Sequence, residues 1–127
     1  MSVQAQYLAY VLEQLTGLGN VTTRRMFGAV GLYSGELFFG LIDDDTLFFK
    51  TDVTNAASYQ ARNMPRFMPQ ADRPASPMGY HQVPADVIEE AEELVAWARR
   101  SVAVALTRHA AKRAGKTRRK SAAKRRR

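Results

Sequence analysis

Strand-like runs alternate with turn residues four times between Val21 and Asp52. The runs are VTTRRMF, AVGLYS, ELFFGLI and TLFFKTD, and β-branched and aromatic residues are frequent in them. Ser34-Gly35 follows the second run, and three consecutive acids at 43–45 follow the third. This alternation predicts an antiparallel meander.

The third and fourth runs are apolar on both faces. In TLFFKTD, for example, Leu47 and Phe49 lie on one face, while Phe48 and Lys50 lie on the other. A strand with two apolar faces is covered on both sides or lies in a subunit interface. We therefore expect a central sheet that is packed by helices.

Helical patterns flank the meander. Residues 2–17 place apolar side chains on one helical face, with Ser2 as the expected N-cap. Residues 54–63 predict a short helix capped by Thr54 or Asn55.

The strongest helical pattern begins at Pro84, since proline suits the first turn of a helix. It continues beyond residue 100 with acids early and bases late. Trp97, Ser101 and Val104 form a second face, expected to cover the first helix or a partner. Short strands are expected at 66–68 and 78–83. The fold class is thus α+β, with an antiparallel meander of about four to five strands flanked by an N-terminal helix, a short middle helix and a long C-terminal helix.

Charge divides the chain into two parts. Residues 1–107 hold eight Lys and Arg and all twelve Asp and Glu, for a formal charge of −4. Residues 108–127 hold eleven Lys and Arg and no acid, for +11. We expect a domain over 1–107 and a basic tail over 108–127 that is disordered when free, although its alanines would permit a helix on an anionic surface.

The tail predicts non-specific nucleic-acid binding, because Lys and Arg neutralise phosphates and release counterions. A solubility tail, a ribosome-binding end and acidic partners other than nucleic acid are alternatives. The candidate binding residues are Arg108, Lys112, Arg113, Lys116, Arg118, Arg119, Lys120, Lys124, Arg125, Arg126 and Arg127.

The glycines at 28 and 31 resemble part of a phosphate-binding loop. Such a loop requires a helix after the glycines, whereas here a strand and a hairpin follow. Gly28 and Gly31 are therefore interpreted as sheet architecture, relieving a bulge or admitting a closely packed helix. Arg24 and Arg25 point to opposite faces of a strand, so we expect one in solvent and the other at an edge or paired with an acid. Anion binding by this motif is the alternative to simple solvation.

The remaining candidates for chemistry are weak. The three acids at 43–45 point in different directions in a tight turn, so a metal site is not expected there. His81 is interpreted as a half-buried structural histidine, since no nucleophile motif accompanies it. The sequence predicts no enzyme, no cofactor and no metal. It also has no stretch long and apolar enough to span a membrane and no cysteine, which fits a cytoplasmic protein.

Several motifs together resemble the N-terminal domain of the TfoX/Sxy family. The most diagnostic residues are Arg24, Arg25, Met26, Phe27 and Gly28, followed by Gly31-Leu32-Tyr33; the elements around Pro65-x-Phe67-x-Pro69 and Tyr80-x-x-Val83-Pro84 agree in order and spacing. The resemblance covers residues 1 to about 107. It implies an α+β domain and a role in regulation, since the named members are positive regulators of natural-competence genes that act alongside a cyclic-AMP-responsive transcription factor.

The family resemblance carries over no catalytic residues. The regulators have a second, helical domain after this one, whereas a basic tail stands in its place here. The expected function is therefore transcription- or nucleoid-associated regulation, with nucleic acid as a partner and a transcription factor, RNA polymerase or a second copy as further candidates. The alternative is a protein–protein or dimerisation module with no nucleic-acid role.

Overall fold

The computed structural model describes residues 3–67 and 79–125, and the side chains up to residue 115. It has an α+β fold with one five-stranded antiparallel sheet in the order β1-β2-β3-β4-β5, which confirms the predicted meander. The strands are β1 (Val21–Met26), β2 (Ala29–Ser34), β3 (Leu37–Asp43), β4 (Thr46–Thr51) and β5 (Gly79–Gln82).

Two-residue turns connect the first four strands. Asp44 and Asp45 form the β3–β4 turn with φ values of 50° and 52°. Gly35, with φ of 59°, begins the β2–β3 turn. Both turns lie where the sequence predicts them, because Gly and Asp accept the left-handed backbone that tight hairpins require.

The pairing of β2 with β3 shifts by one residue at Phe39. Leu32 pairs with Gly40, but Tyr33 pairs with Phe38, so β3 carries one extra residue between them. This shift turns Phe39 towards the buried core, where its exposed fraction is 0%. It also leaves Phe38 on the opposite face of the sheet.

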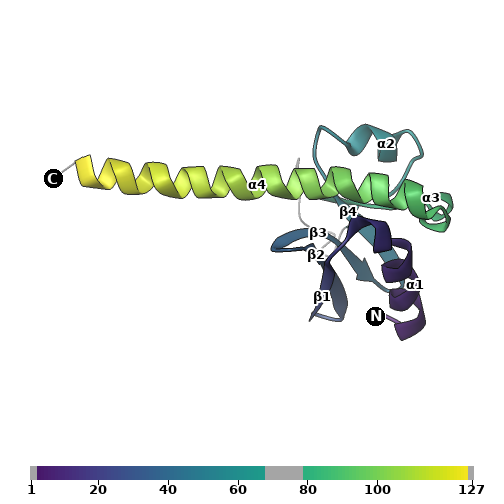
Figure 1. Cartoon of the computed structure of the whole chain (residues 1–127). Coiled ribbons are helices and arrows are strands. Elements are labelled where there is room, and N and C mark those ends of the chain that lie inside the picture. The colour runs from purple at the N-terminus through teal and green to yellow at the C-terminus, as the bar shows by residue number, and fades with distance from the viewer. Residues whose placement is uncertain (1–2, 68–78, 126–127) are drawn as a thin grey trace.

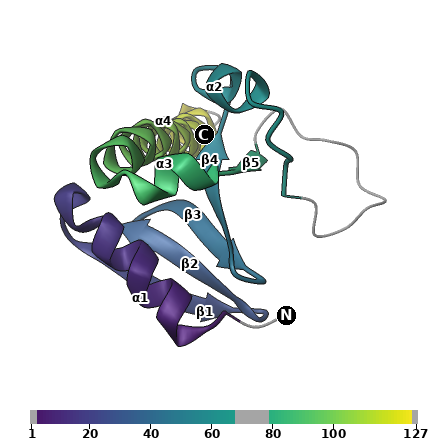
Figure 2. The same cartoon turned by 90° about the vertical axis from the view of Figure 1, so that its right-hand side faces the viewer.

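Helices cover one face of the sheet (Figures 1 and 2). They are α1 (Ala5–Gln14), the 3-10 turn η1 (Thr16–Leu18), α2 (Ala56–Gln60), α3 (Ala85–Glu89) and α4 (Ala91–Arg125). The core lies between them and the sheet and is formed mainly by buried side chains of α1, the strands and α4, including Val11, Leu15, Leu32, Phe39, Ile42, Phe49 and Leu94. Strands β3 and β4 contact α4 directly.

The helix predicted to begin at Pro84 is two helices. Glu90 has φ of −103° and ψ of 101°, an extended conformation that separates α3 from α4. Pro84 is the N-cap of α3, one position before the expected first turn. Val87 and Ile88 of α3 are buried in the same core as Leu94 of α4.

The N-terminal ends of α1 and α2 also differ from expectation. The helix α1 begins at Ala5, with Gln4 rather than Ser2 as its N-cap, and Ser2 lies outside the described residues. Asn55 occupies the N-cap of α2, but its side chain does not cap the helix. Instead, its Oδ1 accepts a hydrogen bond from the Asp52 amide and its Nδ2 donates to the Lys50 carbonyl.

The short strand predicted at 66–68 is a single bridge within the described residues. Arg66 pairs with His81, and the Phe67 amide donates to the Tyr80 carbonyl over 2.8 Å. Met68 lies outside the described residues. The strand predicted at 78–83 is β5, which forms the edge of the sheet beside β4.

The helix α4 continues through the basic segment as far as Arg125 and extends beyond the rest of the molecule (Figure 1). The expectation of disorder from Arg108 therefore differs from the structure. The segment is rich in Ala, Lys and Arg, which favour helix, and it prolongs a helix already nucleated by packing. In the described part of the chain, no helix combines the length and apolarity needed to cross a membrane.

Candidate nucleic-acid interface

The first half of α4 is fixed to the sheet by buried side chains. Leu94, Ala98 and Ser101 have exposed fractions of 0%. The Ser101 hydroxyl donates a hydrogen bond to the Lys50 carbonyl of β4 over 2.7 Å. The second apolar face predicted for this helix therefore packs on β4 and on Tyr59 of α2, whose ring lies 4.8 Å from that of Trp97.

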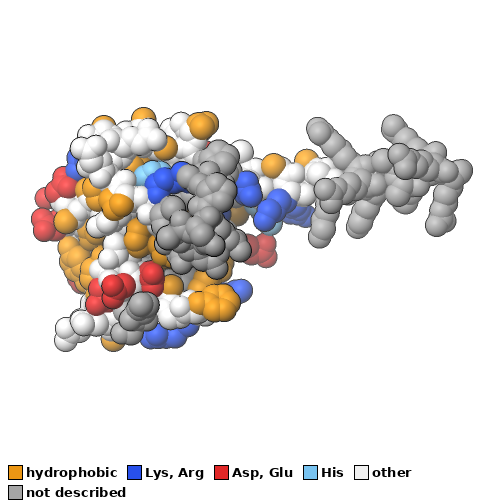
Figure 3. Space-filling model, turned by 180° about the vertical axis from the view of Figure 1, so that it is seen from behind, with side chains coloured by type: hydrophobic (Ala, Val, Ile, Leu, Met, Phe, Trp, Pro, Cys, Tyr) orange, Lys and Arg blue, Asp and Glu red, His pale blue; other side chains and the backbone are white. Residues whose placement is uncertain are grey.

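Burial along α4 stops abruptly before the basic segment. Ala105 is buried, whereas Leu106 is 55% exposed. Arg108 follows as an exposed side chain, and Lys112 and Arg113 are exposed about one helical turn later. Figure 3 shows Lys and Arg side chains at the base of the projecting helix. The packed half of α4 thus carries the basic half beyond the end of the sheet (Figure 1).

The other predicted basic residues divide into two groups. The backbone of α4 includes positions 116–125, so Lys116, Arg118, Arg119, Lys120, Lys124 and Arg125 belong to the same helix. Arg126 and Arg127 lie outside the described residues. Positions 108, 112, 116 and 119 are separated by three or four residues, so they recur on successive helical turns.

The face of the sheet opposite the helices carries a cluster of rings and cations. We call it the aromatic-basic cluster, and it consists of Arg24, Tyr33, Phe38, Lys50 and Tyr80. The ring of Phe38 lies between the other two, with its centroid 5.1 Å from that of Tyr33 and 5.7 Å from that of Tyr80. All three rings are partly exposed.

Two cations of the cluster lie against these rings. The Lys50 Nζ is 5.5 Å from the Phe38 centroid and 5.8 Å from the Tyr80 centroid. The Arg24 guanidinium is 5.2 Å from the Tyr33 centroid. These distances are typical of cation–π contacts, so the cations and rings form one continuous surface.

The basic half of α4 approaches this cluster. Burial lowers the pKa of Lys50, and the positive charges of Arg108 and Lys112 lower it further. Burial and the nearby Tyr33 raise the pKa of Tyr80 to about 12, although Arg108 opposes that rise. Residues far apart in the sequence therefore act on the same electrostatic surface at the end of the sheet.

Gly31 forms the floor of the cluster beside Arg24. A Cβ atom at this position would lie 2.8 Å from the Met26 Cε, 2.9 Å from the Phe38 Cε1 and 3.2 Å from the Tyr33 Cε1. Gly31 thus admits side chains rather than the helix or bulge that we expected. The bulge of this sheet lies at Phe39.

The arginine pair lies on the edge strand β1. Arg24 and Arg25 are both exposed on this edge strand, which fits the expectation of one arginine in solvent and the other at an edge. Arg24 contacts Tyr33 rather than an acid. Phe27 and Gly28 form the β1–β2 turn, with φ values of 50° and 82°, and the Phe27 side chain is fully exposed.

His81 has a structural environment. Its exposed fraction is 5%, its Nδ1 lies 2.7 Å from the Thr51 hydroxyl oxygen, and its ring packs 5.4 Å from that of Tyr59. Among the described residues, no three His, Asp or Glu side chains gather into a metal-binding group. Asp45 instead accepts a hydrogen bond from the Gln4 amide, which ties the β3–β4 turn to the start of α1.

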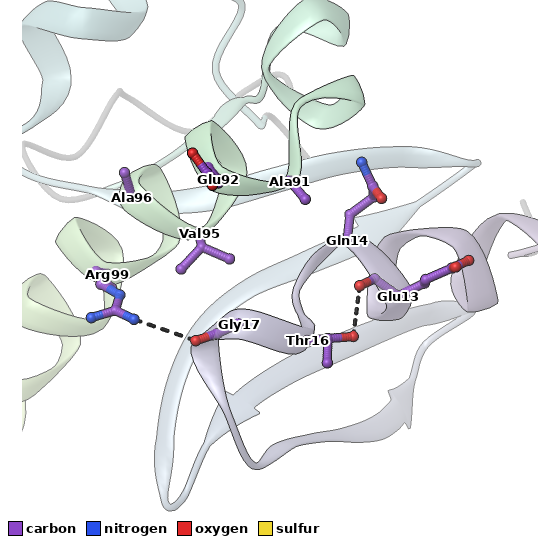
Figure 4. A pocket seen from close by; sticks show the side chains of 9 residues that line it. All are labelled: Glu13, Gln14, Thr16, Gly17, Ala91, Glu92, Val95, Ala96 and Arg99. Atoms are coloured by element: carbon purple, nitrogen blue, oxygen red, sulfur yellow. Dashed lines mark hydrogen bonds between the residues drawn. The ribbon is translucent and has the colours of Figure 1, made fainter.

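A groove of about 450 Å³ separates the end of α1 from α4 (Figure 4). Several of its polar groups serve the fold. The Arg99 guanidinium donates to the Gly17 carbonyl over 3.3 Å, and the Thr16 hydroxyl donates to the Glu13 carbonyl over 2.6 Å. Val95 comes within 3.4 Å of the position of a Cβ on Gly17. The groove is therefore a seam between helices with no evident catalytic arrangement.

Sequence reasoning missed the aromatic-basic cluster. It placed Phe48 and Lys50 on one strand face, but it interpreted the rings as packing. The available signal was the alternation of Lys50 with ring positions on that face. Finding the partners also required the β2–β3 register and the pairing of β5.

Comparison with known proteins gives one family. The family model described as the TfoX N-terminal domain matches residues 13–105. These residues include α3, every strand and the packed half of α4, but not the basic segment from Arg108. A search of curated proteins gives no match to the chain.

Proposed function

We propose, because the chain belongs to the TfoX N-terminal domain family, that it is a regulatory protein associated with transcription or with the nucleoid. This family is not a known enzyme family, and we propose a non-enzymatic role. In this proposal the basic helical segment from Arg108 binds nucleic acid without sequence preference. A cytoplasmic location, near DNA, follows from that role.

The observation that carries the proposal is the charge division along α4. The segment 108–127 has eleven basic residues and no acid, while the body has a net charge of −4. An exposed helix with cations on successive turns neutralises phosphates along a backbone. Phosphate contacts alone carry no sequence information, so this binding is expected to be non-specific.

Salt dependence of DNA binding provides the first test. If about half of the eleven cations contact phosphates, log K against log salt has a slope of roughly −5. Replacing Arg108, Lys112 and Arg113 with Gln should reduce the steepness of this slope by about 1 to 3, because each lost phosphate contact removes roughly 0.9. The measurement is fluorescence anisotropy with a short duplex over a series of salt concentrations.

A matched control uses exposed alanines of the same helical turns. The triple variant Ala110→Gln, Ala111→Gln, Ala114→Gln introduces three glutamines and leaves the charge unchanged. It should bind as the unaltered chain does. Deleting residues 108–127 removes the whole segment after the last buried position, and equal DNA binding by the truncated and intact chains would refute the proposal.

A protein–protein or dimerisation module is the second candidate function. Phe27, Val53 and Leu106 are large apolar side chains with exposed fractions of 106%, 86% and 55%. A transcription factor, RNA polymerase or a second copy would be the partner. Sedimentation of the purified chain tests the dimer: a single monomeric species at micromolar concentration would count against self-association.

A further inference from the structure

We propose that the aromatic-basic cluster is a stacking platform for single-stranded nucleic acid, continuous with the basic segment of α4. This inference rests on the proposed function, and it adds a second contact surface with a different chemistry. The basic segment offers charge alone. The cluster offers the faces of rings as well, and unpaired bases can stack on such faces.

The geometry of the cluster suits this ligand. Tyr33, Phe38 and Tyr80 lie in contact along three different strands, with centroid separations of 5.1 and 5.7 Å. They stand on the sheet face that the helices leave uncovered. A β-sheet face with partly exposed rings is a recurrent surface for the bases of single strands.

Charge favours a nucleic acid over a protein partner. Arg24 and Lys50 lie within 6 Å of the ring centroids, and Arg108 and Lys112 lie close enough to lower the pKa of Lys50. Acids are few along β2, β3 and the turn between them. Glu36 in the turn and Asp43 at the end of β3 are the two acids of this stretch. A chain that carries one negative charge per nucleotide complements this excess of cations.

The two surfaces should respond differently to strandedness. Bases of a duplex are paired and stacked on each other, so they do not reach the rings, and a duplex is expected to use the basic segment alone. A single strand can place phosphates on Arg108 and Lys112 and bases on the rings. We therefore expect tighter binding of a single strand than of a duplex of equal length.

The test measures binding of the full chain to a 5′-labelled oligodeoxythymidine of about 12 nucleotides and to a duplex of the same length. The variant Tyr33→Leu, Tyr80→Leu removes two ring faces and keeps apolar volume. It should lose roughly tenfold or more in affinity for the single strand, since base stacking is worth about 1–3 kcal/mol per base. Its affinity for the duplex should be unchanged.

Two further variants serve as controls for this comparison. Tyr10→Leu removes an exposed tyrosine of α1 outside the cluster and should bind both ligands normally. Replacing Arg108, Lys112 and Arg113 with Gln should lower the affinity for both the single strand and the duplex. Unchanged single-strand affinity in the Tyr33, Tyr80 variant would overturn this inference and leave the proposed function intact, whereas an unaltered chain that binds neither ligand overturns both.

Photocrosslinking of the unaltered chain avoids any effect of substitution on folding. An oligonucleotide with 5-iodouracil in place of thymine crosslinks to rings that stack on it. Peptide mapping should place crosslinks at Tyr33, Phe38 or Tyr80. Crosslinks confined to residues outside the cluster would refute the inference that the rings bind bases.

Discussion

The Thr51 hydroxyl oxygen lies 2.7 Å from the His81 Nδ1 across the β4–β5 pair, and both side chains are buried. The ring of Tyr59 packs against His81 from α2. These two contacts join the edge strand β5 to its neighbour β4 and to the helix α2. Protonation of His81 would place a charge in that junction, so the junction should depend on pH.

Stability should fall as pH falls below about 6.5, the ordinary pKa of histidine. Burial lowers the pKa of His81 in the folded chain, and the positive charge of Arg66 lowers it further. As the pH falls, His81 therefore binds a proton in the unfolded chain before it does so in the folded chain. Unfolding becomes easier between pH 6.5 and the lower pKa of the folded chain. Urea unfolding at pH 7.5 and pH 5 measures the loss. His81→Gln should reduce it, whereas His109→Gln should not.

The Ser101 hydroxyl bond to the Lys50 carbonyl should contribute to holding α4 on the sheet. Ser101→Ala should lower the free energy of unfolding by about 1 kcal/mol, because a buried hydrogen bond is lost. The Lys50 carbonyl still accepts a hydrogen bond from the Asn55 Nδ2, which limits the loss of stability. Thr107→Ala is the matched control, since the Thr107 hydroxyl bonds only within α4. Equal effects of the two substitutions in thermal unfolding would contradict this account.

Local patterns predicted the elements of this fold but not its long-range relationships. The strands and the turns at 34–35 and 43–45 followed from residue type, because hairpin geometry is local. The α4 extension did not, because charge repulsion argued for disorder while the helix is prolonged from a packed segment. Lys50 meets Phe38 and Tyr80 only through the register of two strand pairs, β3–β4 and β4–β5, and no single run encodes that register.

Alanine should be tolerated less well at Gly40 than at Gly31. A Cβ at Gly40 would lie 2.7 Å from the Phe48 carbonyl oxygen, which belongs to a paired strand and cannot readily move. At Gly31 the closest atoms are the Met26 Cε and the Phe38 Cε1, which lie towards the ends of their side chains. These side chains can shift more readily than the backbone of a paired strand. We expect losses of about 3 kcal/mol for Gly40→Ala and about 1 kcal/mol for Gly31→Ala in urea unfolding. The reverse order would show that the sheet yields more easily than its side chains.

Phe27 occupies a turn position that suits asparagine better than phenylalanine. Its φ of 50° is left-handed, Gly28 follows with φ of 82°, and the ring is fully exposed, so burial does not offset the backbone strain. Phe27→Asn creates the Asn-Gly pair that such turns prefer and should raise the free energy of unfolding by about 0.5–1 kcal/mol. Phe27→Leu keeps the strain and should give no gain. If Phe27→Asn instead lowers the thermal midpoint, the ring contributes contacts to the folded chain that its exposure does not reveal.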